Sequence, residues 1–263
     1  MRPTMRAAAL AATALLALTA CSSSGDDAAA DAAGELTLVN PGTLTVCTNP
    51  PFEPFEFEDE NGEIVGLDID ITREVADDLG VDLEVVVTPF DTLESGASLT
   101  TDACDILASG LTITDERAEK FDFSEPYFDA DQGLLVAEGS DIDDVESLAG
   151  KKIAVQMATT GETWVEDEGL TPVQYEDLGL QINALRTGQV DAVVNDIAVL
   201  GPFITEGLEV ATTFPTGEQY GLGVKKGNTA LLEAVDATLD RIHEDGTYDA
   251  IYTERIGTAP TAD

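Results

Sequence analysis

Two patterns of apolar residues alternate along the chain. Runs rich in β-branched and other apolar residues predict strands at 43–49, 82–89, 104–112, 151–156 and 190–196. Between the first two runs, Ile71, Val75 and Leu79 follow a helical spacing of four, and Gly80 is expected to end that helix. This order of elements predicts an α/β protein with mainly parallel sheets.

Two further helices follow from the same spacing. Leu178, Ile182 and Leu185 share one helix face before Gly188. Near the C-terminus another apolar stripe is formed by Leu232, Val235, Leu239 and Ile242. In α/β sheets, ligands collect at the carboxyl ends of the strands, so the residues that follow each strand are the candidates for a site: 49–52, 109–112, 156–160 and 195–196.

These strand ends, with the residues that follow them, offer partners for both charges of an α-amino acid. Arg117 carries a planar guanidinium suited to a carboxylate, and Asp196 offers a carboxylate to an ammonium. Thr112 adds a hydroxyl and an N–H group, and the segment 159–161 precedes a helix expected to begin near Glu162, where N–H groups can meet an anion. Two aromatic residues in loops that follow strands, Phe52 and Phe90, could pack on the ligand.

Each of these residues also has a structural alternative. Arg117 could be a surface residue paired with Asp115 or Glu116, and Asp196 could cap a helix. The two aromatic residues could belong to the core. Trp164 is expected to pack within the fold and His243 to be solvated, rather than to act on a ligand.

Charge and composition narrow the function. The chain has 12 Lys and Arg against 52 Asp and Glu, a formal net charge of −40. Nucleic acid is an unsuitable partner because phosphate binding relies on clustered basic residues. The hydrophobic fraction of 43% argues against disorder.

The N-terminus predicts export. Arg2 and Arg6 precede a short apolar run that ends at Cys21, and the whole of 1–20 is expected to be a signal peptide. Leu18-Thr19-Ala20-Cys21 is similar to a bacterial lipobox, which implies cleavage before Cys21, acylation of its thiol and an extracytoplasmic, lipid-anchored protein. An ordinary signal peptide is the alternative. Residues 21–35 then form the acylated Cys and a flexible tether.

Two cysteines remain after Cys21. Cys47 and Cys104 are expected to form a disulfide in an oxidising exterior, with two buried free thiols as the alternative. With His243 as the single histidine, the sequence predicts no metal site, and no cofactor is expected.

Several segments in order carry a resemblance to a known family: VCTNPPFEPFEFEDENGEIVGLDIDI, SGLTITDERAEKFDFSEPYF, LAGKKIAVQMATTGE, GQVDAVVNDIAVL and EQYGLGVKKGN. Over 36–257 the chain resembles the family 3 extracellular solute-binding proteins, the substrate-binding lipoproteins of polar amino acid ABC transporters. The resemblance implies a two-lobed, type II periplasmic-binding-protein-like fold with two hinge strands and the ligand in the interlobe cleft. Lobe 1 would be 36–129 plus 222–257, lobe 2 would be 130–221, and 258–263 a tail, with crossings near 127–131 and 218–222.

The resemblance also implies roles for residues. Arg117 would bind the ligand carboxylate and Asp196 its ammonium, and Asn49 and Gln156 would set side-chain specificity. The complete set of expected ligand-binding residues is Asn49, Phe52, Phe90, Ser109, Gly110, Thr112, Arg117, Gln156, Thr159, Thr160 and Asp196. Ala158 departs from the family, which commonly has Gly there. Because Asn49 and Gln156 are neutral, we expect a neutral polar ligand such as glutamine; a cationic one could use the two aromatic residues or Glu53.

The resulting expectation is a monomeric receptor, not an enzyme, that delivers an amino acid to the permease subunits of an ABC importer. Three alternatives stay open: a receptor for an amino-acid-like osmolyte, an enzyme of the dehydratase type on the same fold, and a sensor domain. An enzyme would need an acid or base at the reacting centre.

Overall fold

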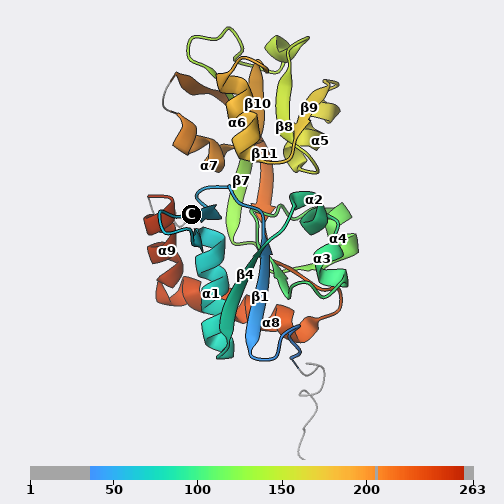
Figure 1. Ribbon diagram of the computed structural model, residues 1–263, viewed down its shortest axis with the longest axis vertical. Coiled ribbons are helices and arrows are strands. Elements are labelled where there is room, and N and C mark those ends of the chain that lie inside the picture. Colours follow the sequence, from blue (N-terminus) through green and yellow to red (C-terminus); the bar gives the residue numbers. More distant parts are fainter. Residues whose placement is uncertain (1–35, 205–206, 258–263) are drawn as a thin grey trace, which may run out of the picture. The chain divides into compact units, whose positions relative to one another are not determined.

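Two five-stranded sheets organise the protein (Figure 1). The computed structural model describes residues 36–204 and 207–257. The order in the first sheet is β4 (Asp82–Val87), β1 (Thr43–Thr48), β5 (Ile106–Leu107), β12 (Gly223–Val224) and β6 (Asp122–Phe123). In the second it is β11 (Leu208–Tyr220), β7 (Phe128–Ala137), β10 (Ala192–Asp196), β8 (Ile153–Gln156) and β9 (Pro172–Tyr175). A small hairpin joins β2 (Phe57–Glu58) to β3 (Ile64–Val65).

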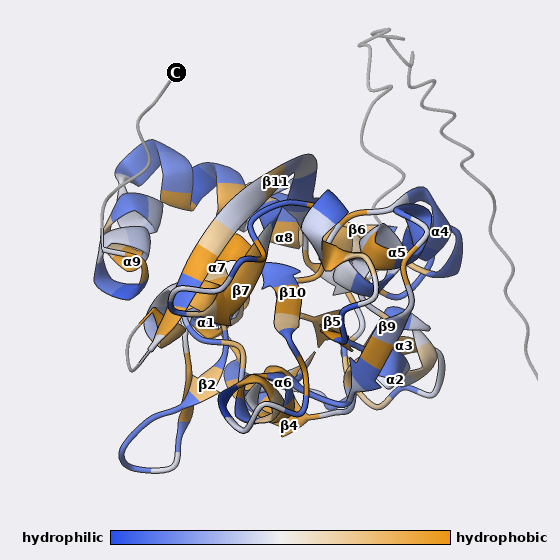
Figure 2. Cartoon of the chain, turned by 90° about the horizontal axis from the view of Figure 1, so that it is seen from above, coloured by the Kyte–Doolittle hydropathy of each residue, from blue (hydrophilic) through white to orange (hydrophobic). Residues whose placement is uncertain are grey.

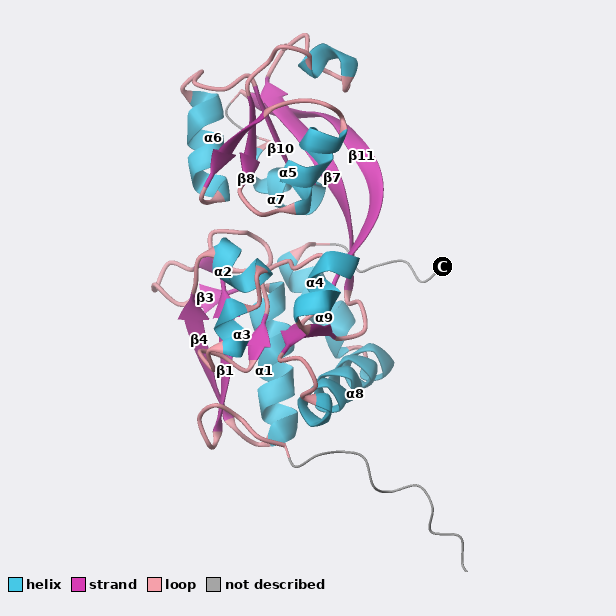
Figure 3. Cartoon of the chain, turned by 90° about the vertical axis from the view of Figure 1, so that its right-hand side faces the viewer, coloured by secondary structure: helices cyan, strands magenta, loops and turns pink. Residues whose placement is uncertain are grey.

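Helices flank both sheets (Figure 3). With the first sheet belong α1 (Leu67–Leu79), α2 (Phe90–Glu94), α3 (Ala97–Thr100), α4 (Asp115–Lys120), α8 (Thr229–Asp245) and α9 (Thr247–Arg255). With the second belong η1 (Glu146–Leu148), α5 (Thr160–Asp167), α6 (Leu178–Arg186), α7 (Ile197–Leu200) and η2 (Gly201–Phe203). α1 packs on both α8 and α9.

The predicted helices and strands are present, although the strand expected at 104–112 is reduced to β5, Ile106–Leu107. The expectation of mainly parallel sheets is wrong. β1 pairs in parallel with β4 and β5, and β8 with β9 and β10. The other four pairings within the two sheets, β7 with β10 and β11, and β12 with β5 and β6, are antiparallel. The antiparallel strands are those that carry the chain from one sheet to the other and back, so these crossings make both sheets mixed.

The apolar stripes predicted from the sequence face the interior. In α1, Ile71 and Val75 are buried, and Gly80 ends the helix in the left-handed conformation at φ 68°. Strands β7 and β10 are hydrophobic over most of their length, whereas α4 is hydrophilic (Figure 2). Burial of these apolar side chains on both faces of each sheet is what fixes the strand ends in space.

The chain crosses between the sheets at the start of β7 and at the end of β11. Tyr127 N–H donates to Tyr220 O at 3.0 Å, next to the ladder in which Tyr220 pairs with Phe128. The Tyr220 ring is fully buried and contacts the rings of Phe55 and Phe128 at centroid distances of 5.1 and 5.5 Å. These crossings fall at the predicted positions 127–131 and 218–222, while the exact lobe boundaries stay a prediction.

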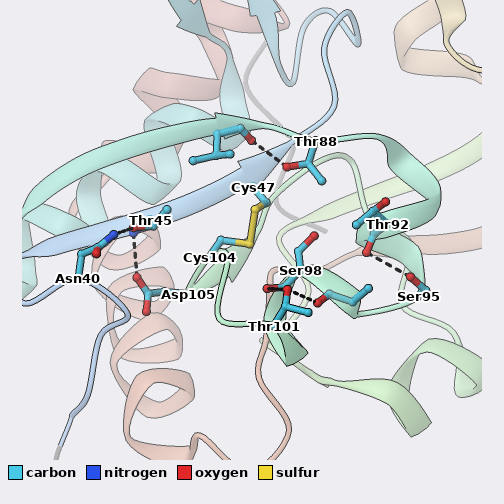
Figure 4. Close-up of a disulfide and its surroundings, with 12 residues drawn as sticks. Asn40, Thr45, Cys47, Thr88, Thr92, Ser95, Ser98, Thr101, Cys104 and Asp105 are labelled. Carbon is cyan, nitrogen blue, oxygen red and sulfur yellow. Dashed lines mark hydrogen bonds between the residues drawn. A yellow bond between two sulfur atoms is a disulfide. The ribbon is translucent and has the colours of Figure 1, made fainter.

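Cys47 and Cys104 form a disulfide in the structure (Figure 4). It joins β1 to the segment before β5, and the two residues are 0% and 2% exposed. Nearby, the buried Asp105 carboxylate accepts hydrogen bonds from Thr45 N–H at 2.9 Å and Val39 N–H at 2.7 Å. The third cysteine, Cys21, lies outside the described residues, as do the predicted signal peptide and the whole of the predicted tether.

Removal of this disulfide is expected to destabilise the protein substantially. The bond closes a loop with a sequence separation of 57 residues, for which the chain-entropy relation gives a loss of about 4 kcal/mol in the free energy of unfolding. Urea unfolding of the oxidised protein and of the double variant Cys47→Ser, Cys104→Ser measures this difference. A reductant should then have no effect on the double variant. A difference below about 1 kcal/mol would contradict the expectation.

Candidate functional site

One pocket brings together all the residues that the sequence assigned to a ligand. Its walls are formed by Asn49, Phe52, Glu56, Phe90, Ser109, Gly110, Thr112, Arg117, Gln156, Thr159, Thr160, Gly161, Asn195 and Asp196. The chain places them together because β1, β5, β8 and β10 all end at this pocket, as the strand-end rule predicts. Their roles toward a ligand remain predictions.

Arg117 is buried in this pocket and not on the surface. Its side chain is held at the start of α4, where Thr114 caps the helix by accepting the Arg117 N–H at 3.2 Å. The guanidinium donates to Thr112 O at 2.9 Å and to Ala158 O at 3.1 Å, and within the described part of the chain it forms no ion pair. The alternative of a surface pair with its acidic neighbours is therefore wrong: Arg117 is 4% exposed.

The surroundings of Arg117 leave its charge available. Its guanidinium carbon lies 5.5 Å from the centre of the aromatic ring of Phe90, and Phe90 is the first residue of α2. Burial lowers the pKa of Arg117, although nearby carboxylates of Glu94, Asp196 and Glu218 oppose the shift. A buried cation whose hydrogen bonds go to carbonyl groups lacks a full counter-charge, and an anionic group bound beside it would supply one.

Asp196 provides the opposite charge at the end of β10. One carboxylate oxygen accepts a hydrogen bond from the Gln132 amide and the other from the Tyr220 hydroxyl. Burial, followed by repulsion from Glu218, raises the pKa of Asp196 to about 7. Asp196 precedes α7 but makes no side-chain cap bond, so capping is not its role in this structure.

Three residues around Asp196 were not identified from the sequence. The Glu218 carboxylate accepts hydrogen bonds from Thr160 at 3.0 Å, from the Gln132 amide at 3.2 Å and from Thr112 at 3.3 Å. Glu218 and Tyr220 lie in β11, and Gln132 lies in β7. Glu218 and Tyr220 belong to the motif EQYGLGVKKGN, which carried part of the family resemblance, whereas Gln132 had no comparable signal.

Glu56 was also missed, although it lines the pocket. It is 0% exposed, and one of its carboxylate oxygens, Oε1, accepts a hydrogen bond from the Ser109 hydroxyl at 2.5 Å. Among the described residues, none provides a hydrogen bond to its second oxygen, Oε2. Burial, followed by repulsion from Asp68, raises the pKa of Glu56 well above its ordinary value. Glu53, named from the sequence as a contact for a cationic ligand, is exposed and does not line the pocket.

The aromatic and glycine residues shape the pocket wall. Phe52 and Phe90 are 8% and 9% exposed and belong to core clusters, yet both also line the pocket, so the core and ligand interpretations agree. Gly110 has φ +49°, and a Cβ atom there would lie 2.5 Å from the Phe52 ring. Only glycine lets the backbone approach this ring so closely.

The two residues predicted to set specificity are bonded to each other. The Gln156 amide donates to Asn49 Oδ1 at 3.0 Å, and the Asn49 amide donates to Thr88 O at 2.9 Å. Thr159 caps α5 by accepting the Glu162 N–H at 3.2 Å, and the helix itself begins at Thr160, two residues before the predicted start.

The pocket is nearly filled by its own side chains. Its cavity volume is about 20 Å³, which holds about one water molecule. Two hydrogen bonds join the two sides of the pocket: Gln156, at the end of β8, donates to Asn49, which follows β1, and Arg117 in α4 donates to Ala158 O, after β8. An amino acid can therefore enter only if these bonds separate and its own groups replace them.

Within 36–204 and 207–257, no three His, Cys, Asp or Glu side chains are grouped so that they could hold a metal ion. No helix in the same ranges is both long and apolar enough to cross a membrane. His243 is exposed, and Trp164 stacks on Phe214 at a centroid distance of 4.1 Å, as expected for a solvated and a packing residue.

The known proteins that this chain is similar to are named as amino-acid-binding proteins, which agrees with the pocket described above. A protein of Neisseria gonorrhoeae named "Probable histidine-binding protein" is 35% identical over 94% of this chain and 93% of its own length. A glutamine-binding protein of an ABC transporter from Bacillus subtilis is 32% identical over 76% of each chain. The solved structure of an ancestral arginine-binding protein bound to arginine matches with 39% identity and a TM-score of 0.78, covering 82% of this chain and 99% of the other.

The family model for the bacterial extracellular solute-binding proteins, family 3, matches residues 44–258. This match covers most of the chain, and the two-lobed fold of the related structures agrees with the two sheets and the pocket described above. The chain belongs to the bacterial extracellular solute-binding proteins of family 3.

Proposed function

We propose that this protein is the extracytoplasmic substrate-binding component of an ABC importer and that it binds a polar L-amino acid. One observation carries the proposal: Arg117 and Asp196, buried and of opposite charge, line the same small pocket. A zwitterion would place its carboxylate at Arg117 and its ammonium at Asp196, so that each buried charge gains a partner. Relatives that bind histidine, glutamine or arginine by name support a ligand of this class.

Lobe closure is part of the proposal. Thr112 and Arg117 come after β5 of the first sheet. Thr160 comes after β8 of the second sheet, and Asp196 ends β10 of the same sheet. A ligand that contacts both groups gains all its bonds only when the lobes are together, so binding shifts the population toward that state. The permease subunits would then receive a protein whose surface differs between its loaded and empty states. We further propose that Cys21 carries the lipid that anchors this monomeric receptor to the membrane.

A calorimetric panel of L-amino acids on the purified protein tests the proposal. We expect one or a few polar L-amino acids to bind, and their D-enantiomers, decarboxylated amines and desamino acids to bind far more weakly. A ligand at 100 times its dissociation constant should also stabilise the fold by about 2.7 kcal/mol. If no L-amino acid binds, the proposal fails, and betaines and other osmolytes become the next class to test.

A dehydratase is the second candidate. An ancestral amino-acid-binding protein described as a precursor of cyclohexadienyl dehydratase matches with 35% identity and a TM-score of 0.75. The buried carboxyl of Glu56, whose pKa is raised, is the kind of group that a general acid requires. Mass spectrometry of each bound ligand after prolonged incubation distinguishes the two functions, because a receptor returns its ligand unchanged.

A further inference from the structure

Asp68 joins the wall of the pocket to the point where the chain crosses between the sheets. It is the second residue of α1, it is 0% exposed, and it does not itself line the pocket. Its Oδ2 atom accepts a hydrogen bond from Gly110 N–H at 2.8 Å, and its Oδ1 atom accepts one from the Tyr127 hydroxyl at 2.7 Å. Gly110 belongs to the pocket wall, and Tyr127 directly precedes β7. One buried carboxylate therefore bonds to both places.

Tyr127 is held from three sides. Besides the bond to Asp68, its N–H donates to Tyr220 O at 3.0 Å, and its own carbonyl oxygen accepts the Tyr248 hydroxyl at 2.5 Å. These three partners lie in α1, β11 and α9, so the start of β7 is attached to two helices that flank the first sheet and to the other crossing strand. Tyr220 in turn donates through its hydroxyl to Asp196. A movement of the crossing that displaces Tyr127 must therefore disturb bonds that lead into the pocket.

The wall at Gly110 has little freedom of its own. Its φ is +49°, and a Cβ atom there would lie 2.5 Å from the Phe52 ring and 3.2 Å from the Tyr220 ring. The backbone is therefore packed against both rings, while its N–H is held by Asp68. Because Tyr220 belongs to β11 and Asp68 is bonded to Tyr127, this wall is connected to both crossings. A ligand that contacts the wall can act on the crossings through these contacts.

We propose that Asp68 is a positioning residue that couples occupancy of the pocket to closure of the two lobes. It touches no ligand and acts through Gly110 on one side and through Tyr127 on the other. Both bonds are present in the state in which the two sides of the pocket are joined. Their loss should lower the population of that state and let a bound ligand leave sooner. This inference rests on the proposed function and deepens it.

Two variants test the link. Asp68→Ala removes both bonds, whereas Tyr127→Phe removes only the hydroxyl bond and keeps the ring. We expect each to raise the calorimetric dissociation constant of the preferred L-amino acid at least about tenfold, as for the loss of one hydrogen bond to a charged group. The loss should lie in the dissociation rate, followed by stopped-flow fluorescence of the single tryptophan, Trp164, which lines the hollow beside Arg117. Dissociation constants within about 3-fold of the wild type in both variants would overturn the proposal.

A double-mutant cycle and a conservative variant separate positioning from general damage. If Asp68 acts through Tyr127, the double variant Asp68→Ala, Tyr127→Phe should bind no more weakly than Asp68→Ala alone. Losses that multiply would contradict the link. Asp68→Asn can keep both bonds, because its amide oxygen can accept the Gly110 N–H while its nitrogen donates to the Tyr127 oxygen. It should bind within about 3-fold of the wild type, and a loss as large as in Asp68→Ala would also overturn the proposal.

Asp105→Ala is the matched control. Asp105 is another buried carboxylate beside the first sheet, and it too accepts two hydrogen bonds, from Thr45 N–H and Val39 N–H, but it does not line the pocket. Its loss should lower the free energy of unfolding and leave affinity unchanged. Equal weakening of binding in Asp105→Ala and Asp68→Ala would reduce the effect to general destabilisation and overturn the inference. Should Asp68→Ala fail to fold, Tyr127→Phe decides; a wild type that binds no L-amino acid would overturn the proposed function instead.

Discussion

Arg117→Ala is expected to weaken binding of the preferred L-amino acid by at least about 30-fold, and by as much as about 5,000-fold. Truncating one partner of a buried, hydrogen-bonded charge pair costs about 2–5 kcal/mol, which corresponds to this range. In this protein the loss would be large because Arg117 is 4% exposed and none of the other described residues that line the pocket is basic. The ligand carboxylate would then be buried without a counter-charge.

Calorimetric titration measures this effect, with Arg73→Ala as the matched control. Arg73 is an exposed residue of α1 that does not line the pocket, and its removal should leave affinity unchanged. Thermal unfolding of both variants without ligand checks that the fold persists. An Arg117→Ala protein that binds within about 3-fold of the wild type would exclude the carboxylate clamp, since even an exposed ion pair can contribute that much.

The second large effect is a loss of affinity in acid. An ammonium binds to the ionised form of Asp196, whose pKa is raised to about 7 by burial and by Glu218. Below that pH the free protein holds a proton on Asp196, which must leave before the ammonium can pair. Well below pH 7 each pH unit therefore lowers affinity about tenfold, and glutamine or another neutral ligand should bind about 16-fold more weakly at pH 5.5 than at pH 7, where half of the Asp196 carboxyls are already ionised.

Titrations at pH 5.5, 6.5 and 7.5 in buffers of different ionisation enthalpy measure both the affinity and the protons released. A neutral ligand should release close to one proton per molecule at the lowest pH. Asp196→Asn should bind weakly at every pH without this slope, and a wild-type affinity that is constant over the range would show that Asp196 does not meet the ammonium.

The raised pKa of Asp196 also affects the stability of the unliganded protein, but here acid has a stabilising effect. A carboxyl whose pKa is raised in the folded state binds protons more tightly there than in the unfolded chain. Its stabilising contribution is complete below the ordinary value of 3.8 and declines as the pH rises toward about 7. Asp68, with a pKa of about 6 caused mainly by burial, acts in the same direction. Acid thus stabilises these two sites while it weakens ligand binding.

The sequence predicted the pocket where a topological rule applied. Asn49, Ser109, Gln156 and Asp196 follow or end strands, and strands of these sheets end at one edge regardless of the details of packing. The position of Arg117 followed from its motif and not from periodicity. These residues could be grouped before any contact was known because their placement depends on chain order and strand direction.

The missed residues depend on information that is absent from local sequence. Gln132 reaches Asp196 because β7 and β10 pair in a register that places the two residues opposite each other. Glu218 accepts hydrogen bonds from Thr112 and Thr160, which lie 106 and 58 residues away from it in the sequence. Glu56 points inward and Glu53 outward because the loop closes through backbone bonds between Phe52 and Glu56. The pattern of charged residues along the sequence does not show which of the two glutamates is buried.

The bonds of Glu218 have a consequence for how affinity can evolve. Glu218 does not line the small pocket, yet it accepts hydrogen bonds from Thr112 on one side and from Thr160 and Gln132 on the other. These bonds favour a state in which the pocket is already occupied by the chain itself, and the apparent dissociation constant rises as the fraction of receptive molecules falls. Substitutions at position 218 could therefore tune uptake to scarce or abundant nutrient without altering which amino acid is recognised.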